Sequence, residues 1–251
     1  MVHIVGAGCG APDLITLRGK AHIENADVII YAGSLVNKEL LKFAKRGCAI
    51  HDSAKMTLEE ITAVMTEAEA KGLTTVRLHT GDPSLYGAIG EQMREMDKLG
   101  IEYDITPGVS SFSGAAAALK TEYTLPDVSQ TVIITRAAGK TPVPEKEALR
   151  SLASHGATMV LFLSAGLLKE AEDELIAGGY PPDAPAAIVY KASWEDEKVC
   201  RCTVGTLQRT AQENGIKKTA IITVGGFLQS GFARSHLYDP DFSTEFREAK
   251  K

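Results

Sequence analysis

Long hydrophobic runs are missing from this sequence. Its longest apolar stretches are DVIIY, TVIIT, TMVLFL, AAIVY and TAIITV. Each is far shorter than the roughly 20 residues that a helix needs to cross a bilayer. The N-terminus also lacks the basic region, apolar segment and small-residue cleavage site of a secretory signal. We therefore exclude a membrane span and expect a cytoplasmic protein.

Cysteine is scarce, and neither cysteine nor histidine forms a metal-binding pattern. The four cysteines, Cys9, Cys48, Cys200 and Cys202, include no C-x-x-C pair and have no histidine at zinc spacing. Cys200 and Cys202 stand two apart in a strand-like stretch, which would place both on one face. The six histidines are scattered along the chain. We expect reduced, structural thiols and no metal site.

Positive charge is not in excess. The chain has 27 Lys and Arg against 32 Asp and Glu, which gives a net charge of −5 and a pI near 5.7. Nucleic-acid-binding proteins usually carry a stripe of Lys and Arg, so the composition argues against such a partner. An anionic ligand would need a local basic pocket. The 44% of hydrophobic residues and 24% of charged residues are ordinary for a globular protein with a sizeable core.

Strand and helix patterns alternate through the first half of the chain. Strand patterns occur at 3–8, 27–31, 48–53, 74–82 and 102–108, and helical patterns at 13–24, 35–45, 57–71, 85–98 and 109–119. Thr57 and Glu60 form a capping-box pattern, and Lys71 and Gly72 give a stop signal for the same helix. The alternation predicts a parallel sheet covered by helices.

Polar and turn residues in KTEYTLPDVSQ interrupt this pattern before a second α/β series begins at TVIIT. We therefore expect two α/β lobes, residues 1–120 and 121–251. The segment 196–207, DEKVCRCTVGTL, alternates like an edge or antiparallel strand. The second sheet is for that reason predicted to be mixed.

Four glycine-containing turns follow predicted strands, at 6–10, 79–87, 105–111 and 222–227. Ligands of open α/β sheets bind in the crevice beyond the carboxyl ends of the strands. Several such turns in one lobe can therefore share one binding site.

The first turn, VGAGCGAPDL, partly matches a dinucleotide-binding motif. Gly6, Gly8 and Ala11 satisfy the loose G-x-G-x-x-G/A spacing. That function also requires an acidic residue at the end of the second strand, which binds the ribose hydroxyls. Residues 32–34 at this position are Ala-Gly-Ser. The sequence therefore disfavours a nicotinamide cofactor.

The second of these turns suits an adenosine-containing ligand, and the serines of the third could present hydroxyls to a ligand. Gly81 permits close backbone approach, Asp82 offers an acceptor, and Tyr86 could pack beside a flat ring. Both turns have a structural alternative, in which Asp82 binds only backbone amides and Ser110 and Ser111 cap a helix. Neither serine lies in a G-x-S-x-G elbow, which argues against a hydrolase.

Three segments closely resemble the signatures of the tetrapyrrole methylases, which use S-adenosylmethionine to methylate a corrin precursor. They are VGAGCGAPDLITLRG, GDPSLYGA and TPGVSSFSGAAAAL, and their order matches too. Four more, YAGSLVN, ITRAAGKTPVPEKE, TMVLFLSAG and LYDPDFSTEFR, are similar to the branch of the family that methylates C11 of (cobalt-)precorrin-4 in cobalamin biosynthesis. The resemblance covers nearly the whole chain. It implies a tetrapyrrole methylase fold with a ligand cleft between two lobes, C11 methylation, and a homodimer.

The resemblance also implies which residues hold S-adenosylmethionine, largely through main-chain atoms. The matching positions are Cys9, Thr80, Gly81, Asp82, Leu85, Ser110, Ser111, Leu163, Ala192 and Ala220, with Tyr86 beside them. Leu163 replaces a methionine common in relatives, and Cys9 and Ala11 stand where the first loop usually has proline and aspartate. Uroporphyrinogen methylases carry an acid where this chain has Ala32 and Gly33, which argues against that activity. No catalytic acid or base can be named.

A substrate with many carboxylate arms needs cations. The candidates, which follow strands or helices next to the predicted cleft, are Arg136, Lys140, Lys120 and Lys191. Each could equally be a solvated surface charge. Arg136 is preferred because a guanidinium binds a carboxylate in bidentate fashion.

Other functions on the same fold stay open. Methylases of a different precorrin carbon, of ribosomal RNA or of diphthamide share it, and a non-enzymatic S-adenosylmethionine sensor would bind the ligand without turnover. An RNA substrate predicts a basic face and steep salt dependence, which the acidic composition disfavours. The residues do not indicate whether the ring already carries cobalt.

Overall fold

The computed structural model describes residues 1–229, 231 and 233–249. The chain forms two compact units. The first consists of Met1–Ala115 together with a later segment, Lys191–Glu197, and the second of Ala116–Tyr190 and the residues from Lys198 onward. Within the described part of the chain, no helix is both long and apolar enough to cross a membrane.

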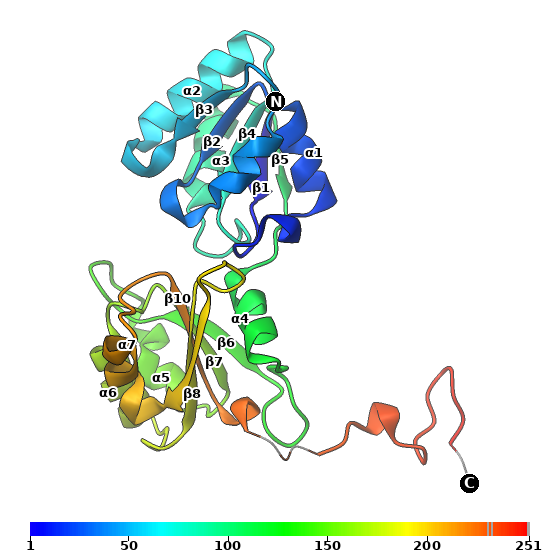
Figure 1. Cartoon of the computed structure of the whole chain (residues 1–251), viewed down its shortest axis with the longest axis vertical. Helices are drawn as coiled ribbons and strands as arrows, with labels where there is room; N and C mark the ends of the chain where they lie inside the picture. The colour runs from blue at the N-terminus through cyan, green and yellow to red at the C-terminus, as the bar shows by residue number, and fades with distance from the viewer. Residues whose placement is uncertain (230, 232, 250–251) are drawn as a thin grey trace. The chain divides into compact units, whose positions relative to one another are not determined.

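The first unit is built on a sheet of five parallel strands, as predicted (Figure 1). The strands are β1 (Val2–Gly6), β2 (Val28–Tyr31), β3 (Ala49–Asp52), β4 (Thr75–His79) and β5 (Tyr103–Thr106). Their order is β3-β2-β4-β1-β5, so β1 lies between β4 and β5. Val2 pairs with Thr75 on one side and with Tyr103 on the other, which brings the carboxyl ends of these three strands to one edge of the sheet.

Helices cover both faces of this sheet, which buries its central strands completely. They are α1 (Leu17–Asn25), α2 (Leu58–Ala70) and α3 (Ile89–Leu99). The apolar cluster on the α2 and α3 face consists of Val2, Ile4, Val28, Ile30, Ile61, Met65, Ala68, Ile89, Met96 and Ile101. The cluster on the α1 face consists of Val5, Ala7, Ile23, Ala26, Ile29, Tyr31, Val36, Leu40, Val76 and Leu78. Because successive side chains of a strand point to opposite faces, the neighbours Ile29 and Ile30 join different clusters.

The second unit contains a mixed sheet of five strands, which confirms the prediction from the sequence. The strands are β6 (Val132–Arg136), β7 (Thr158–Phe162), β8 (Pro185–Tyr190), β9 (Lys198–Thr203) and β10 (Ala220–Val224). Their order is β6-β7-β10-β8-β9. The β6–β7 pair is parallel, and the other neighbours are antiparallel. Strand β9, predicted to be an edge or antiparallel strand, is both.

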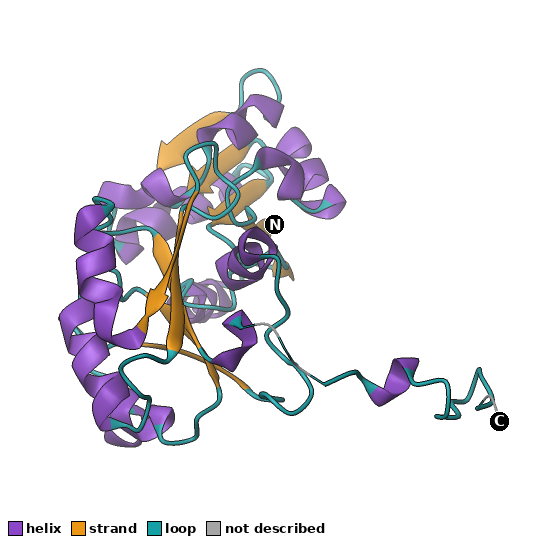
Figure 2. Cartoon of the chain, turned by 60° about the horizontal axis from the view of Figure 1, so that its bottom comes forward, coloured by secondary structure: helices purple, strands orange, loops and turns teal. Residues whose placement is uncertain are grey.

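The core of the second unit lies between this sheet and three helices that run along one side of its strands (Figure 2). These helices are α5 (Leu149–Ala153), α6 (Leu168–Ala177) and α7 (Leu207–Glu213). Met159, Leu161, Ile188 and Ile222 supply fully buried side chains from the strands. The remaining helix, α4 (Ser111–Leu119), contains the division between the two units.

Short 3₁₀ helices fill several connections. They are η1 (Pro12–Leu14), η2 (Gly33–Leu35), η3 (Lys38–Phe43), η4 (Ser53–Lys55), η5 (Glu145–Glu147), η6 (Val204–Thr206), η7 (Gly226–Leu228) and η8 (His236–Tyr238). The α-helix predicted at 35–45 is therefore wrong. The backbone of Gly33 has a left-handed conformation, and the side chain of Asn37 accepts a hydrogen bond from the amide of Glu39. The segment therefore forms two short 3₁₀ helices and no long α-helix.

The predicted helix ends agree best where a capping motif is present. Thr57 and Glu60 cap α2 reciprocally, and α2 ends at Ala70 with Lys71 as its C-cap residue, close to the predicted end. The helix predicted at 85–98 instead begins at Ile89, because Ala88 before it is left-handed.

Candidate functional site

The turns that follow β1, β4 and β5 pack on one another through their backbones. Gly8 and Gly81 form a two-way antiparallel bridge, in which the Gly81 amide donates to Gly8 over 2.9 Å and the Gly8 amide donates to Gly81 over 3.3 Å. The amide of Ala7 donates to the carbonyl of His79 over 2.7 Å. Three of the four glycine turns thus lie together in the first unit, where the sequence predicted that several turns of one lobe can share a site. The fourth, at 222–227, belongs to the second unit.

Glycine is required at two of these contacts because the backbones leave no room for a side chain. A Cβ on Gly108 would lie 2.2 Å from the carbonyl oxygen of Gly81, and a Cβ on Gly6 would lie 2.6 Å from the Cα of Gly108. Both separations are far below van der Waals contact. The close approach of the three turns therefore depends on these glycines.

Asp82 ties the β4 turn to the β5 turn. One oxygen of its carboxylate accepts from the Gly108 amide over 3.0 Å, and the other accepts from the amide of Ser84 over 2.9 Å and from the Ser84 hydroxyl. Burial opposes ionisation of Asp82, but these hydrogen bonds outweigh it and lower the pKa of the carboxyl. Asp82 thus holds the β4 and β5 turns together through its hydrogen bonds to Gly108 and Ser84.

The rest of the β4 turn has an unusual backbone. Tyr86 and Ala88 are left-handed, with φ of 56° and 50°, although neither is glycine. Between them, Gly87 has no space for a Cβ, which would lie 2.2 Å from the carbonyl oxygen of Pro83. Tyr86 is 46% exposed. Such backbone strain costs on the order of 1–3 kcal/mol per residue and concentrates at binding sites, which supports a ligand here.

Several polar groups surround these turns. Ser110 is buried, and its carbonyl accepts from the Gly114 amide in the first turn of α4. The hydroxyl oxygen of Thr80 is buried and has no hydrogen-bond partner among the described residues. Burial, and then the positive charge of Arg77, lower the pKa of His79 to about 3. His79 is therefore neutral at neutral pH and too weak a base for proton transfer, so the catalytic acid or base is still unassigned.

A clasp, Lys191–Glu197, packs against the first turn, a contact that was not predicted from the sequence. The Ser193 hydroxyl accepts from the Ala11 amide over 3.0 Å and lies 3.2 Å from the Cys9 thiol. The Trp194 indole donates to the Cys9 carbonyl over 3.2 Å. Cys9 and Ala11 of the first turn are thus held by a segment far away in the sequence.

Two further glycines make room for the clasp. A Cβ on Gly10 would lie 2.2 Å from the Trp194 ring, and a Cβ on Gly114 would lie 2.9 Å from the Cys9 sulfur. Within the clasp, the Lys191 ammonium pairs with Asp196 at 2.6 Å and lies 5.4 Å from the centre of the Trp194 ring. Lys191, predicted to bind substrate, therefore has these partners in the structure.

The predicted residues of the second unit gather at one end of its sheet. Arg136 ends β6, Leu163 follows β7, and Ala220 begins the antiparallel strand β10. Leu163 is left-handed, with a φ of 52°, and is 65% exposed. The buried Ser164 beside it accepts from the Ala137 amide over 2.8 Å, which ties the ends of β6 and β7 together.

The Arg136 guanidinium binds its own loop. It donates to the carbonyls of Ala137, Thr141 and Pro142 over 3.3, 3.1 and 2.6 Å. Among the four predicted cations, Arg136 binds backbone carbonyls of its own loop and Lys191 pairs with Asp196. The side chains of Lys120 and Lys140 are exposed to solvent.

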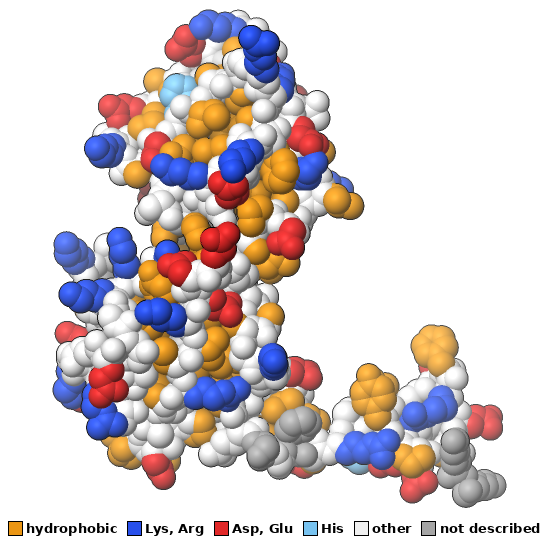
Figure 3. Space-filling view, viewed as in Figure 1, with side chains coloured by type: hydrophobic (Ala, Val, Ile, Leu, Met, Phe, Trp, Pro, Cys, Tyr) orange, Lys and Arg blue, Asp and Glu red, His pale blue; other side chains and the backbone are white. Residues whose placement is uncertain are grey.

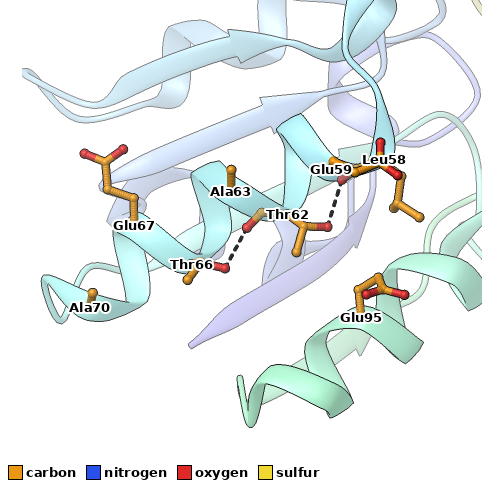
Figure 4. Close-up of a pocket in the computed structure, with 8 residues that line it drawn as sticks. All are labelled: Leu58, Glu59, Thr62, Ala63, Thr66, Glu67, Ala70 and Glu95. Atoms are coloured by element: carbon orange, nitrogen blue, oxygen red, sulfur yellow. Dashed lines mark hydrogen bonds between the residues drawn. The ribbon is translucent and has the colours of Figure 1, made fainter.

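A groove between α2 and α3 contains none of the predicted residues (Figure 4). Its lining residues are Leu58, Glu59, Thr62, Ala63, Thr66, Glu67, Ala70 and Glu95. The Thr62 and Thr66 hydroxyls donate to carbonyls one turn earlier in their own helix. The strand ends, and not this groove, form the candidate site.

Replacing Gly108 by alanine tests the backbone packing. We expect the free energy of unfolding to fall by about 1–3 kcal/mol, because the new methyl group would overlap the Gly81 carbonyl. Urea denaturation followed by circular dichroism measures the loss. Gly90→Ala is the matched control: its Cβ would meet nothing within 4 Å, and alanine favours the helix. Equal stability of the Gly108 variant and the wild type would contradict the close approach.

Comparison with known proteins agrees with this architecture. Residues 1–208 match the family described as Tetrapyrrole (Corrin/Porphyrin) Methylases. The chain is 55% identical to the cobalt-precorrin-4 C(11)-methyltransferase of Methanocaldococcus jannaschii over 251 residues, which cover 100% of this chain and 97% of that protein. It is 45% identical to the precorrin-4 C(11)-methyltransferase of a Sinorhizobium species over 248 residues, 98% of each chain.

A solved structure gives the same result for the fold. The X-ray structure of a cobalamin biosynthetic enzyme, cobalt precorrin-4 methyltransferase, matches with a TM-score of 0.89 and 47% identity, and the match covers 91% of this chain and 96% of that one. The family match spans most of the sequence, and the archaeal relative is similar over all of it. The chain therefore belongs to the tetrapyrrole methylases.

Proposed function

We propose that this chain transfers a methyl group from S-adenosylmethionine to C11 of a precorrin-4 intermediate in cobalamin biosynthesis. The observation that carries the proposal is the end-to-end similarity to relatives with that activity in their names. Those relatives include cobalt-precorrin-4 and precorrin-4 enzymes, so the proposed substrate is the ring with or without cobalt.

The strand ends of the first unit fit a nucleoside held through main-chain atoms. Thr80 offers a buried hydroxyl that has no partner within the described residues, and the left-handed Gly81 sets the adjoining backbone. We propose that these two residues and Ser110 contact S-adenosylmethionine. The other proposed contacts are Cys9, Asp82, Leu85, Tyr86, Ser111, Leu163, Ala192 and Ala220.

Catalysis by this site depends on positioning. When bound, S-adenosylmethionine supplies a methyl group on a positively charged sulfur, and the charge leaves the sulfur as the methyl group moves. A free carboxylate at the sulfur would stabilise the ground state more than the transition state. Asp82 avoids this effect because its carboxylate is already occupied by hydrogen-bond donors. Alignment of donor and acceptor contributes on the order of 7–11 kcal/mol.

A small-molecule tetrapyrrole is the proposed substrate, in preference to RNA. On the face drawn in Figure 3, Lys and Arg side chains are interspersed with Asp and Glu. This mixture agrees with the net charge of −5 and offers no wide basic surface for a phosphate backbone on that face. For the substrate's carboxylates we propose Arg136, Lys140, Lys120 and Lys191 as partners.

We also propose that the chain is a cytoplasmic homodimer, as the family resemblance implies. The C-terminal segment 233–249 supports association with another chain, because it exposes apolar side chains, which are orange in Figure 3. They are Leu237, Tyr238, Phe242 and Phe246, and Phe246 is 91% exposed. Exposed apolar patches commonly mark protein interfaces.

A methyl-transfer assay tests the proposed function. Purified protein would be given S-adenosylmethionine with a ¹³C-labelled methyl group and precorrin-4, with or without cobalt, and NMR would locate the transferred carbon. We expect label at C11 with at least one form of the ring. Label at another ring carbon, or transfer only to an RNA or diphthamide acceptor, would contradict the proposal.

Variants of Arg136 test the substrate side. Arg136→Ala should raise the KM for the precorrin about 10- to 100-fold, the loss expected for a charge-assisted hydrogen bond of about 1.5–3 kcal/mol. Calorimetry should show nearly unchanged affinity for S-adenosylhomocysteine. Arg136 has two roles in this account, which are to bind a carboxylate of the substrate and to order its own loop. Arg136→Lys separates them, because lysine keeps the positive charge but cannot bind the three loop carbonyls. Equal losses of precorrin and S-adenosylhomocysteine binding would remove Arg136 from the substrate site.

A further inference from the structure

Two histidines and an aspartate meet on the α1 face of the first unit, away from the strand ends. One ligand atom from each of His3, His22 and Asp104 lies within 4.8 Å of the other two. The His3 and His22 rings are stacked with their centres 3.9 Å apart, and Nδ1 of His3 lies 2.9 Å from Oδ1 of Asp104.

The fold brings the three together from three separate elements. His3 on β1 is paired in register with Asp104 on β5, the edge strand, so the two side chains are neighbours on one face of the sheet. His22 lies on α1, which packs on that face through Ile23. The sequence did not predict this metal site, because the separations between positions 3, 22 and 104 match no known metal-binding motif.

The chemistry of the cluster is that of a metal ligand set. Nε2 of His22 is buried and, in the described part of the chain, has no hydrogen-bond partner. Two imidazoles and one carboxylate are donors typical of a zinc site with an open position. The Asp104 side chain is 44% exposed, which gives an ion a path from solvent.

We propose that His3, His22 and Asp104 bind one divalent transition-metal ion of the Zn²⁺ class, which fastens α1 to the edge of the first sheet. A tetrahedral ion with bonds of about 2.0–2.2 Å needs its ligand atoms about 3.3 Å apart. Rotation of the half-buried His22 ring and of the exposed Asp104 carboxylate closes the remaining gap from 4.8 Å. Arg18, one turn before His22 on α1, is exposed and can turn into solvent.

The proposed metal site lies toward the start of β1, whereas the proposed methyl-transfer site follows the end of that strand, so the ion takes no part in methyl transfer. Its occupancy should therefore change the stability of the first unit and leave S-adenosylhomocysteine binding unchanged. The inference is independent of the proposed function and can fail separately from it.

Metal binding is measured on the full chain, prepared without a polyhistidine tag. Calorimetry with Zn²⁺ should show one site per chain, and a saturating excess of about 100-fold over Kd should raise the Tm by about 5–10 °C. Co²⁺ should give visible bands without a thiolate charge-transfer band, because no cysteine takes part. His22→Gln should weaken Zn²⁺ binding more than 10-fold, and Asp104→Asn provides a second ligand variant.

The matched control is His155→Gln, which changes an exposed histidine in the second unit and should leave the Zn²⁺ affinity unchanged. Circular dichroism without metal shows whether each variant is folded. Absence of Zn²⁺ binding to the wild type would overturn the proposal. So would undiminished binding in folded His22→Gln and Asp104→Asn variants, or a thiolate band with Co²⁺, which would place the ion at a cysteine.

Discussion

Backbone contact between the ends of β1, β4 and β5 is the constraint on which the candidate site depends. The two-way bridge between Gly8 and Gly81 and the contacts at Gly6 and Gly108 bring three turns closer than side chains would allow. Asp82 completes the arrangement by accepting from the amide of Gly108. A surface made of main-chain groups in fixed positions can recognise a nucleoside without charged side chains, which suits a ligand whose sulfur is itself positively charged.

The clasp Lys191–Glu197 adds a second constraint to the same site. Its Ser193 and Trp194 hold the backbone of the first turn at Ala11 and Cys9. A proline would stiffen such a turn by itself. Here hydrogen bonds from a distant segment fix the turn, so Cys9 and Ala11 are compatible with an ordered site.

The sequence predicted the architecture well because periodicity and capping are local signals. The parallel and mixed sheets and the capped helix α2 follow from patterns within a few residues. The contact of Trp194 with Cys9 and the meeting of His3, His22 and Asp104 could not be read in that way. They join positions up to 185 residues apart, and such contacts depend on strand order and register, which propensity alone does not specify.

Calorimetry of the wild-type chain with two competing adenosine ligands tests the central claim most directly. If the strand ends hold a sulfonium nucleoside through main-chain atoms, S-adenosylhomocysteine should bind at one site per chain and NAD should release no measurable heat. Tight binding of NAD together with no binding of S-adenosylhomocysteine would contradict the account.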